Sequence, residues 1–264
     1  MMKRNLIGLF MIFAAVTAIN AQGNIHSAGE GGVFISERLG LLKNGQGGGL
    51  GNNPAMMNLY NDIRMKFGRM GEEVNLNLGD IEGSIYPNEN FVIGTLYEDG
   101  VAFKKIHMRY DAYNDEVELK ETKDDDLVRA MVQHPIYSCS MNGNQYYYLV
   151  YQDEDGHQKE GYLTPVFSGN YYALFVQQKK VFKEGKPAKT SLDNSFPHRF
   201  VDRTEYYFSK GGDIPIYMKT RKSDIITLFP EEDQKTIKSY MKDKRPNLND
   251  KNDLQNLFAY ASTL

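Results

Sequence analysis

The sequence has a single cysteine, Cys139, and no tryptophan among its 264 residues. A single thiol excludes an internal disulfide, so an exported domain built from this chain must be held together by its own apolar core. Basic residues number 31 against 34 acidic ones, which gives a net charge of −3. This balance offers no electrostatic attraction to nucleic acid, and we expect no nucleic-acid partner. Beyond residue 21 no apolar run reaches the ~20 residues of a membrane-spanning helix.

The N-terminal segment is typical of a secretory signal peptide over residues 1–21. Lys3 and Arg4 precede an apolar run from Leu6 to Ala18, and Ala21 is the small residue at the expected cleavage point. An uncleaved anchor helix is the alternative, but the run is short for a span. We therefore expect an exported protein of the cell envelope, either periplasmic or secreted.

Residues 22–73 are expected to form a glycine-rich, flexible leader, because glycine at this density costs backbone entropy that few side chains repay. A phosphate-binding loop would need a Lys-Ser/Thr pair after the glycines, and Asn52-Asn53-Pro54 stands there instead. Within the leader, residues 54–70 place apolar side chains at helical spacing and predict a short helix.

Residues 74–220 predict an antiparallel β domain. Runs rich in β-branched and aromatic residues are separated by turn residues, including Asp99-Gly100 and Gly211-Gly212, with no helical pattern between them. The fold class is therefore mainly β, a β-rich α+β fold, with a meander sheet arranged as a sandwich or a partly open barrel.

Residues 221–264 predict two to three short helices that pack on the β domain. Ser223 is the expected cap of the first helix, and Pro230 is expected in the first turn of the second. The third is expected to begin near Asn249 or Asp250, with Leu254, Leu257, Phe258 and Ala261 on one face.

The stretch MRYDAYNDEVELK at 108–120 is interpreted as two strands and a turn, with turn chemistry at Asn114-Asp115. Arg109 would then pair across the strands with Glu116 or Glu118, on the outward side of the hairpin. A cation site is the alternative, but the order of the acidic residues departs from that of an EF-hand loop.

No catalytic, cofactor-binding or metal-binding set is recognisable. The five histidines do not form a metal-ligand pattern, and Cys139 has no context of a nucleophile. Acidic clusters at 124–126 and 153–155 are interpreted as solvated loops, with a weak surface calcium site as the alternative at either place.

Tyrosine doublets recur in the predicted strands. Because adjacent strand residues point to opposite faces, each doublet places one ring away from the main core. Tyr147, Tyr172 and Tyr207 are the candidates for an exposed aromatic surface that binds sugars or peptides. The alternative, which we favour, is that helices or the leader cover this face, and the lack of tryptophan also weighs against carbohydrate binding.

The segment GSIYPNENFVIGTLYEDG at 83–100, followed by MRYDAYNDEVELK, resembles exported, uncharacterised β-rich proteins of Bacteroidetes-type bacteria. The resemblance is at the level of patterns and covers residues 83–264. It implies an envelope location and a β-rich body, and it brings no catalytic role.

Three functions remain open at this point. The leading hypothesis is a non-enzymatic β-rich envelope protein that acts through protein or glycan contacts. A periplasmic hydrolase of glycans or peptides is the second, and it requires two carboxylates or an Asp-His pair in one pocket. The third is an outer-membrane β-barrel, against which stand the charged residues within the predicted strands.

Overall fold

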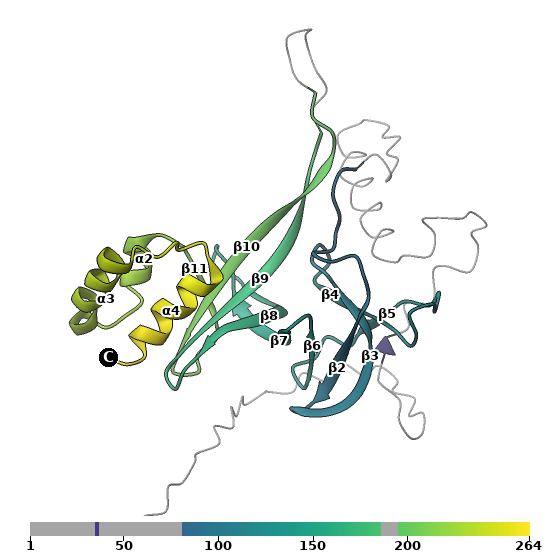
Figure 1. The fold of residues 1–264 in the computed structure, drawn as a ribbon, viewed down its shortest axis with the longest axis horizontal. Helices are drawn as coiled ribbons and strands as arrows, with labels where there is room; N and C mark the ends of the chain where they lie inside the picture. The colour runs from purple at the N-terminus through teal and green to yellow at the C-terminus, as the bar shows by residue number, and fades with distance from the viewer. Residues whose placement is uncertain (1–34, 37–80, 186–194) are drawn as a thin grey trace, which may run out of the picture. The chain divides into compact units, whose positions relative to one another are not determined.

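The computed structural model describes residues 35–36, 81–185 and 195–264 of the chain (Figure 1). The predicted signal peptide and the predicted helix at 54–70 lie outside these residues. The elements are β1 (Ile35–Ser36), β2 (Val92–Glu98), β3 (Val101–Asp111), β4 (Glu116–Lys120), β5 (Arg129–Met131), β6 (Tyr137–Met141), β7 (Asn144–Gln152), β8 (Gln158–Ser168), β9 (Tyr172–Lys183), β10 (Arg199–Lys210), β11 (Ile216–Met218), α2 (Lys222–Ile226), α3 (Glu231–Lys244) and α4 (Lys251–Ala261).

The strands form one sheet in the order β1-β5-β4-β3-β2-β6-β7-β11-β10-β9-β8, with an additional pairing of β7 with β8. The order contains two meanders, β2 to β5 and β6 to β11, which join where β2 pairs with β6. Short turns explain the meanders. Asp99 and Gly100 both have positive φ, 49° and 76°, as do Asn142 and Gly143 at 50° and 74°, which suits two-residue hairpins.

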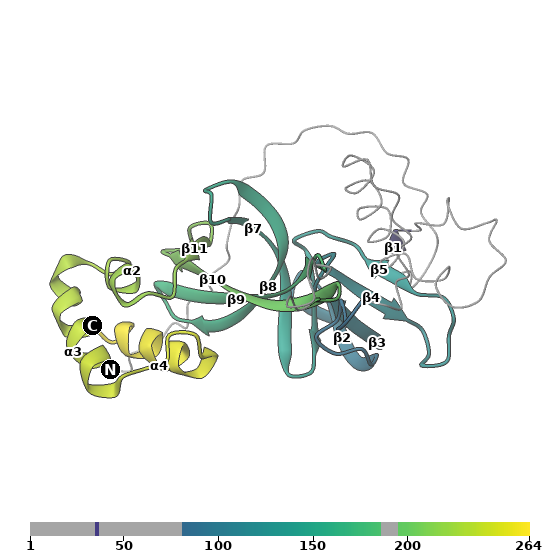
Figure 2. The ribbon, with the colours of Figure 1, turned by 90° about the horizontal axis from the view of Figure 1, so that it is seen from above.

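β7 to β11 close into a ring of hydrogen-bonded strands (Figure 2). The closing contact is parallel and short: Ile216 of β11 pairs with Gln152 of β7, and the Gln152 N–H donates to the Pro215 carbonyl at 2.8 Å. The prediction of a mainly β fold with short C-terminal helices is confirmed. The parallel contact makes the sheet mixed, because the chain returns to β7 after completing the antiparallel meander.

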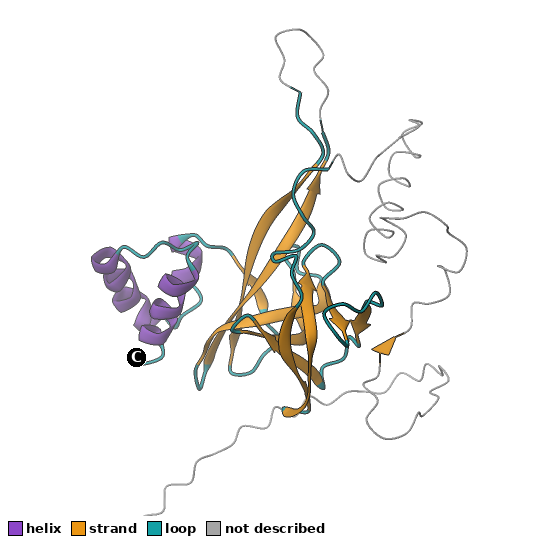
Figure 3. Ribbon diagram, turned by 45° about the vertical axis from the view of Figure 1, so that its right-hand side comes forward, coloured by secondary structure: helices purple, strands orange, loops and turns teal. Residues whose placement is uncertain are grey.

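Residues alternate along β10 between two apolar environments. Tyr206 and Phe208 belong to a core that includes Ile225 of α2 and Phe258 of α4, whereas Tyr207 packs inside the ring. The helices therefore cover the outer face of the ring strands; Figure 3 shows them grouped together after the last strand.

The helices differ in whether a side chain caps their first turn. The side chain of Asp250 caps α4 by accepting hydrogen bonds from the N–H groups of Asn252 and Asp253. Ser223 is not the cap of α2: that position is Arg221, whose side chain makes no capping bond. Among the described residues, the helices are too short or too polar to cross a membrane.

Candidate functional site

Two of the three tyrosines considered for an exposed aromatic surface are covered, in agreement with the alternative that the sequence analysis favours. Tyr172 and Tyr207 are 6% and 0% exposed, and Tyr147 is half-buried. Tyr172 packs under the helices, with its ring 5.3 Å from that of Phe229, and Tyr207 lies inside the ring with its aromatic ring 4.7 Å from that of Tyr151. The helices cover Tyr172 and the ring closure covers Tyr207, so these two rings cannot form an exposed platform.

The structure brings Arg109 and Glu118 together. They are opposite in register, and Arg109 Nε lies 2.6 Å from Glu118 Oε2. Glu116 instead lies opposite Asp111. Glu118 was expected outward but is buried, because the segment before β2 covers this face: the Tyr86 hydroxyl donates to Glu118 Oε1 at 3.1 Å. Through Tyr86, the Arg109–Glu118 ion pair fixes the segment before β2 to the sheet.

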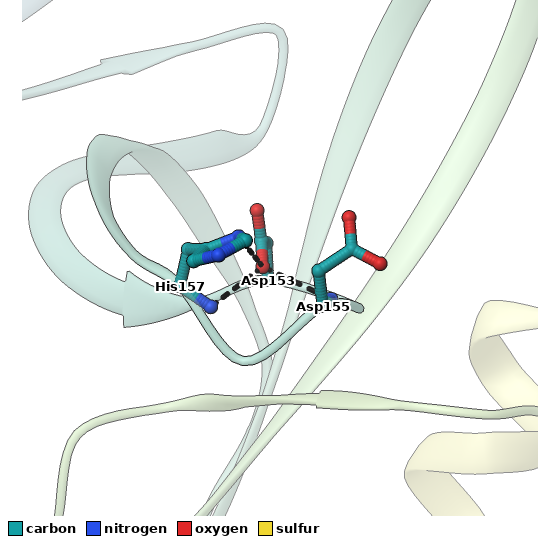
Figure 4. Close-up of side chains that lie close together, drawn as sticks. All are labelled: Asp153, Asp155 and His157. Atoms are coloured by element: carbon teal, nitrogen blue, oxygen red, sulfur yellow. Dashed lines mark hydrogen bonds and ion pairs between the residues drawn. The ribbon is translucent and has the colours of Figure 1, made fainter.

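One acidic cluster has the composition of a cation site. Asp153, Asp155 and His157 lie within reach of one another in the turn between β7 and β8 (Figure 4). However, Asp153 Oδ1 accepts from the N–H groups of Asp155 and His157, and Lys159 Nζ lies 2.7 Å from Oδ2. The Lys159 hydrogen bond lowers the pKa of Asp153 to about 2. Both carboxylate oxygens of Asp153 are therefore occupied by donors of the protein, which disfavours their use as metal ligands.

The other chemically active side chains have structural roles. Cys139 is fully buried, and burial raises the pKa of its thiol to about 12, which makes it a poor nucleophile. His198 stacks on Phe182 at 5.5 Å, and its Nδ1 accepts from the Gly185 N–H. In the cluster at 124–126, Asp125 accepts from the Leu127 N–H within its loop.

A polar cavity of about 180 Å³ opens where the two meanders meet the start of α4. We name it the tyrosine cavity, because four tyrosines contribute to its wall. It is lined by Tyr110, Asn144, Tyr146, Tyr162, Thr164, Val176, Gln177, Gln178, Thr204, Tyr206, Asn249 and Lys251. The lining contains amide, hydroxyl and ammonium groups and no carboxylate.

Strand alternation builds the floor of the cavity. Tyr162 and Thr164 lie two residues apart on β8, and Thr164 pairs with Val176 of β9, which in turn pairs with Tyr206 of β10. These residues are buried, whereas Gln178, Thr204 and Asn249 are exposed and form the rim. The cavity therefore has a buried aromatic floor and an amide-rich mouth.

Aromatic contacts connect the floor to the first meander. The Tyr110 ring of β3 lies 5.1 Å from that of Tyr146 and 6.4 Å from that of Tyr162. Tyr162 is 1% exposed, and its hydroxyl has no hydrogen-bond partner among the described residues. A buried hydroxyl without a partner costs about 1–3 kcal/mol, so this one stands out in an otherwise well-paired site.

Asp115 ties the turn between β3 and β4 to the wall behind the cavity. β8 pairs with β9 only from Thr164 onward, and the Asp115 carboxylate enters the seam where that ladder stops. It accepts from the Tyr110 hydroxyl at 2.6 Å, from the Tyr162 N–H at 3.1 Å and from Gln177 Nε2 at 3.1 Å. The carboxylate thereby satisfies a backbone donor that β9 leaves unpaired.

The polar contacts continue into the ring. Gln177 Oε1 lies 3.3 Å from the Tyr207 hydroxyl, which donates to Glu205 Oε2 at 2.7 Å. Lys179 Nζ lies 2.5 Å from the same Glu205 oxygen. Burial raises the pKa of Glu205, but the hydrogen bonds from Lys179 and Tyr207 outweigh this effect and hold the pKa below its ordinary value. The network keeps Gln177 in a fixed position at the cavity wall.

Lys251 is the cation of the cavity wall. It is the first residue of α4 and half-buried, and its ammonium group donates to Asn144 Oδ1 at 3.1 Å. That is its single hydrogen bond within the described part of the chain. An ammonium group offers three donors, so it retains capacity for a ligand.

The sequence pointed to the tyrosine doublets but not to this cavity. Tyr146 and Tyr206 line it, and each is the neighbour of a residue proposed from the sequence. Lys251 carried a usable signal, because a cation in the first turn of a helix opposes the macrodipole. Comparisons with known protein families, with curated proteins and with solved structures found no match to this chain.

Proposed function

We propose that this chain is an exported, non-enzymatic binding protein of the cell envelope, which holds one sugar unit of a glycan in the tyrosine cavity. The observation that carries the proposal is the lining: tyrosine side chains beside amide and hydroxyl groups, and no carboxylate. Tyrosine presents an apolar ring for the C–H face of a sugar, and amides and hydroxyls pair with sugar hydroxyls. The volume of about 180 Å³ suits a single small unit.

The lining favours binding over hydrolysis. Glycoside hydrolysis uses a pair of carboxylates on either side of the bond that is cleaved. Asp115 is the carboxylate that reaches the wall, and it is occupied by three donors behind Tyr110 and Gln177. The cavity therefore lacks the acid and the base that the hydrolase hypothesis requires.

Titration of the purified chain with single sugars, followed by calorimetry, tests the proposal. The probes are glucose, galactose, N-acetylglucosamine, glucuronate and galacturonate. We expect saturable binding of at least one of them, and loss of that binding in Thr204→Tyr, because the larger side chain at the exposed rim narrows the mouth. Thr95→Tyr, on β2 and outside the lining, is the matched control and should bind as the unmodified chain does.

Two outcomes would contradict the proposal. One is that none of the five sugars binds saturably. The other is that Thr204→Tyr and Thr95→Tyr bind equally well, which would place the binding site elsewhere.

A further inference from the structure

We infer that the tyrosine cavity selects a carboxylate-bearing sugar, such as a uronic acid, and that Lys251 is the residue that recognises the carboxylate. This inference rests on the proposed function and specifies its ligand class. Two observations carry it: a lysine in the wall without an acidic partner, and a floor that contains tyrosine rings.

The first observation concerns the charge of Lys251. Its one hydrogen-bond acceptor in the described part of the chain is the neutral amide oxygen of Asn144. The two flanking acids on α4 are occupied elsewhere: Asp250 accepts from the N–H groups that it caps, and Asp253 Oδ2 accepts from the Asn247 N–H at 2.8 Å. The ammonium charge therefore faces a wall that contains no carboxylate.

The position of Lys251 is unfavourable for helix stability. It is the first residue of α4, where the partial positive charge of the helix end repels a cation. Asp250 already caps the helix end, so the ammonium group of Lys251 is the group that favours an anion at this edge of the cavity. A residue that opposes a local stability rule is expected at binding sites, where function compensates for the cost.

The second observation concerns the floor. Tyr162 is 1% exposed and its hydroxyl is fully buried, so a ligand in the cavity meets tyrosine rings there and not this hydroxyl. Aromatic rings pack against the C–H face of a sugar. A floor of this kind suits a ring-shaped ligand more than a free anion.

These features together favour an acidic sugar over a free anion. The wall offers one cation, which matches the single charge of a carboxylate. The remaining polar groups are the amides of Asn144, Gln178 and Asn249 and the hydroxyls of Thr164 and Thr204, which match the hydroxyls of a sugar ring. A small carboxylate without a ring would leave most of these groups unused.

The experiment compares matched sugars that differ in the carboxylate. Glucuronate and glucose form one pair, galacturonate and galactose the other, and acetate serves as the carboxylate without a sugar. We expect the acid of at least one pair to bind about tenfold more tightly than its neutral parent, the usual strength of a charge-assisted hydrogen bond. The preference should weaken as salt is raised, because ions screen a half-exposed charge.

Charge variants assign the preference to one residue. Lys251→Met should bring acid and neutral sugar to equal affinity, while Lys251→Arg should keep a preference for the acid. Lys238→Met removes the same charge from the exposed surface of α3 and should leave the preference unchanged. Thermal unfolding checks that each variant is folded, and Lys251→Met should melt no lower than the unmodified chain because the substitution removes a charge that the helix dipole disfavours.

The outcomes separate this inference from the function on which it rests. Equal affinity for acid and parent in the unmodified chain, or a preference that survives Lys251→Met, would overturn the inference while sugar binding stands. Acetate that binds as tightly as the uronates would also overturn it, since the sugar would then contribute nothing. Failure of every sugar to bind would overturn both.

Discussion

At the scale of single residues, Gly161 and Asp115 determine how the first meander is fixed to the ring. Asp115 has a positive φ of 55°, which directs the turn after β3 toward the seam between β8 and β9. Gly161 lies on β8 at that seam, and a Cβ added there would collide with Asp115 Oδ2. The glycine is therefore required for the close approach of a side chain, and not for an unusual backbone angle.

Replacing Gly161 by alanine should lower the free energy of unfolding by about 1–3 kcal/mol, because the added methyl group overpacks the seam. Asp115→Gly removes the colliding carboxylate and suits the positive φ, and it should cost about 1–3 kcal/mol through the donors that it leaves unpaired. In the double variant the cost of the alanine should largely disappear. Urea unfolding of all four proteins measures the coupling. If the alanine costs the same with and without the Asp115 carboxylate, the collision lies elsewhere.

The residue scale also shows what sequence pattern can and cannot predict. The sequence shows three adjacent tyrosines at 146–148 and two at 206–207, and strand alternation correctly predicted that Tyr206 and Tyr207 lie on opposite faces. Which ring lines a cavity depends on what covers each face. That cover comes from α4 and from the turn holding Asp115, both distant in sequence, so the pattern alone led to Tyr147 and Tyr207 instead of Tyr146 and Tyr206.

At the scale of elements, the helices differ in what starts them. α4 has a capping carboxylate at Asp250 that accepts from two backbone N–H groups. α2 is a helix of five residues with no side-chain cap, and its Ser223 hydroxyl contacts the Asp224 side chain at 3.1 Å. Packing of Ile225, which is fully buried, therefore has to stabilise α2.

Two alanine substitutions separate these cases. Asp250→Ala should lower the free energy of unfolding by about 1 kcal/mol, because two N–H groups at the start of α4 lose their acceptor. Ser223→Ala should change it by less than about 0.5 kcal/mol, since this serine is exposed and caps nothing. Chemical unfolding monitored by circular dichroism measures both values. Equal losses in the two variants would show that the capping geometry does not determine the difference.

Element prediction succeeded where the local signal was strong. The predicted turns at Asp99-Gly100 and Gly211-Gly212 each follow a strand, the first between β2 and β3 and the second after β10. β5 and β6 were missed. β5 has three residues, and β6 contains serines and a cysteine in place of a clear alternation, although the Asn142-Gly143 turn that follows it is a strong hairpin signal.

At the scale of the whole molecule, closure of the ring and packing of the helices depend on contacts between distant segments. The closing pair joins Gln152 to Ile216, and no local periodicity encodes a single parallel contact at that separation. The amphipathic pattern of α4 was readable, and its predicted face is the buried one. Which strands that face covers is decided by the ring, whose outer side presents Leu174, Tyr206 and Phe208 to the helices.

The helices and strands should therefore unfold as one unit, and Phe258 tests this. Its ring lies 5.7 Å from that of Phe208 on β10 and 5.6 Å from that of Phe229 after α2. Phe258→Ala should cost about 3–5 kcal/mol, because it leaves a cavity at the junction of the sheet and the helices. Tyr260→Ala, two residues along the same helix, should cost about 1 kcal/mol, since this half-buried ring mainly stacks on Tyr240 at 4.4 Å.

In Phe258→Ala the far-ultraviolet signal of the backbone and the near-ultraviolet signal of the tyrosines should shift together to lower urea. Loss of helix signal at low urea, with the tyrosine signal unchanged, would mean that the ring is stable without its helices.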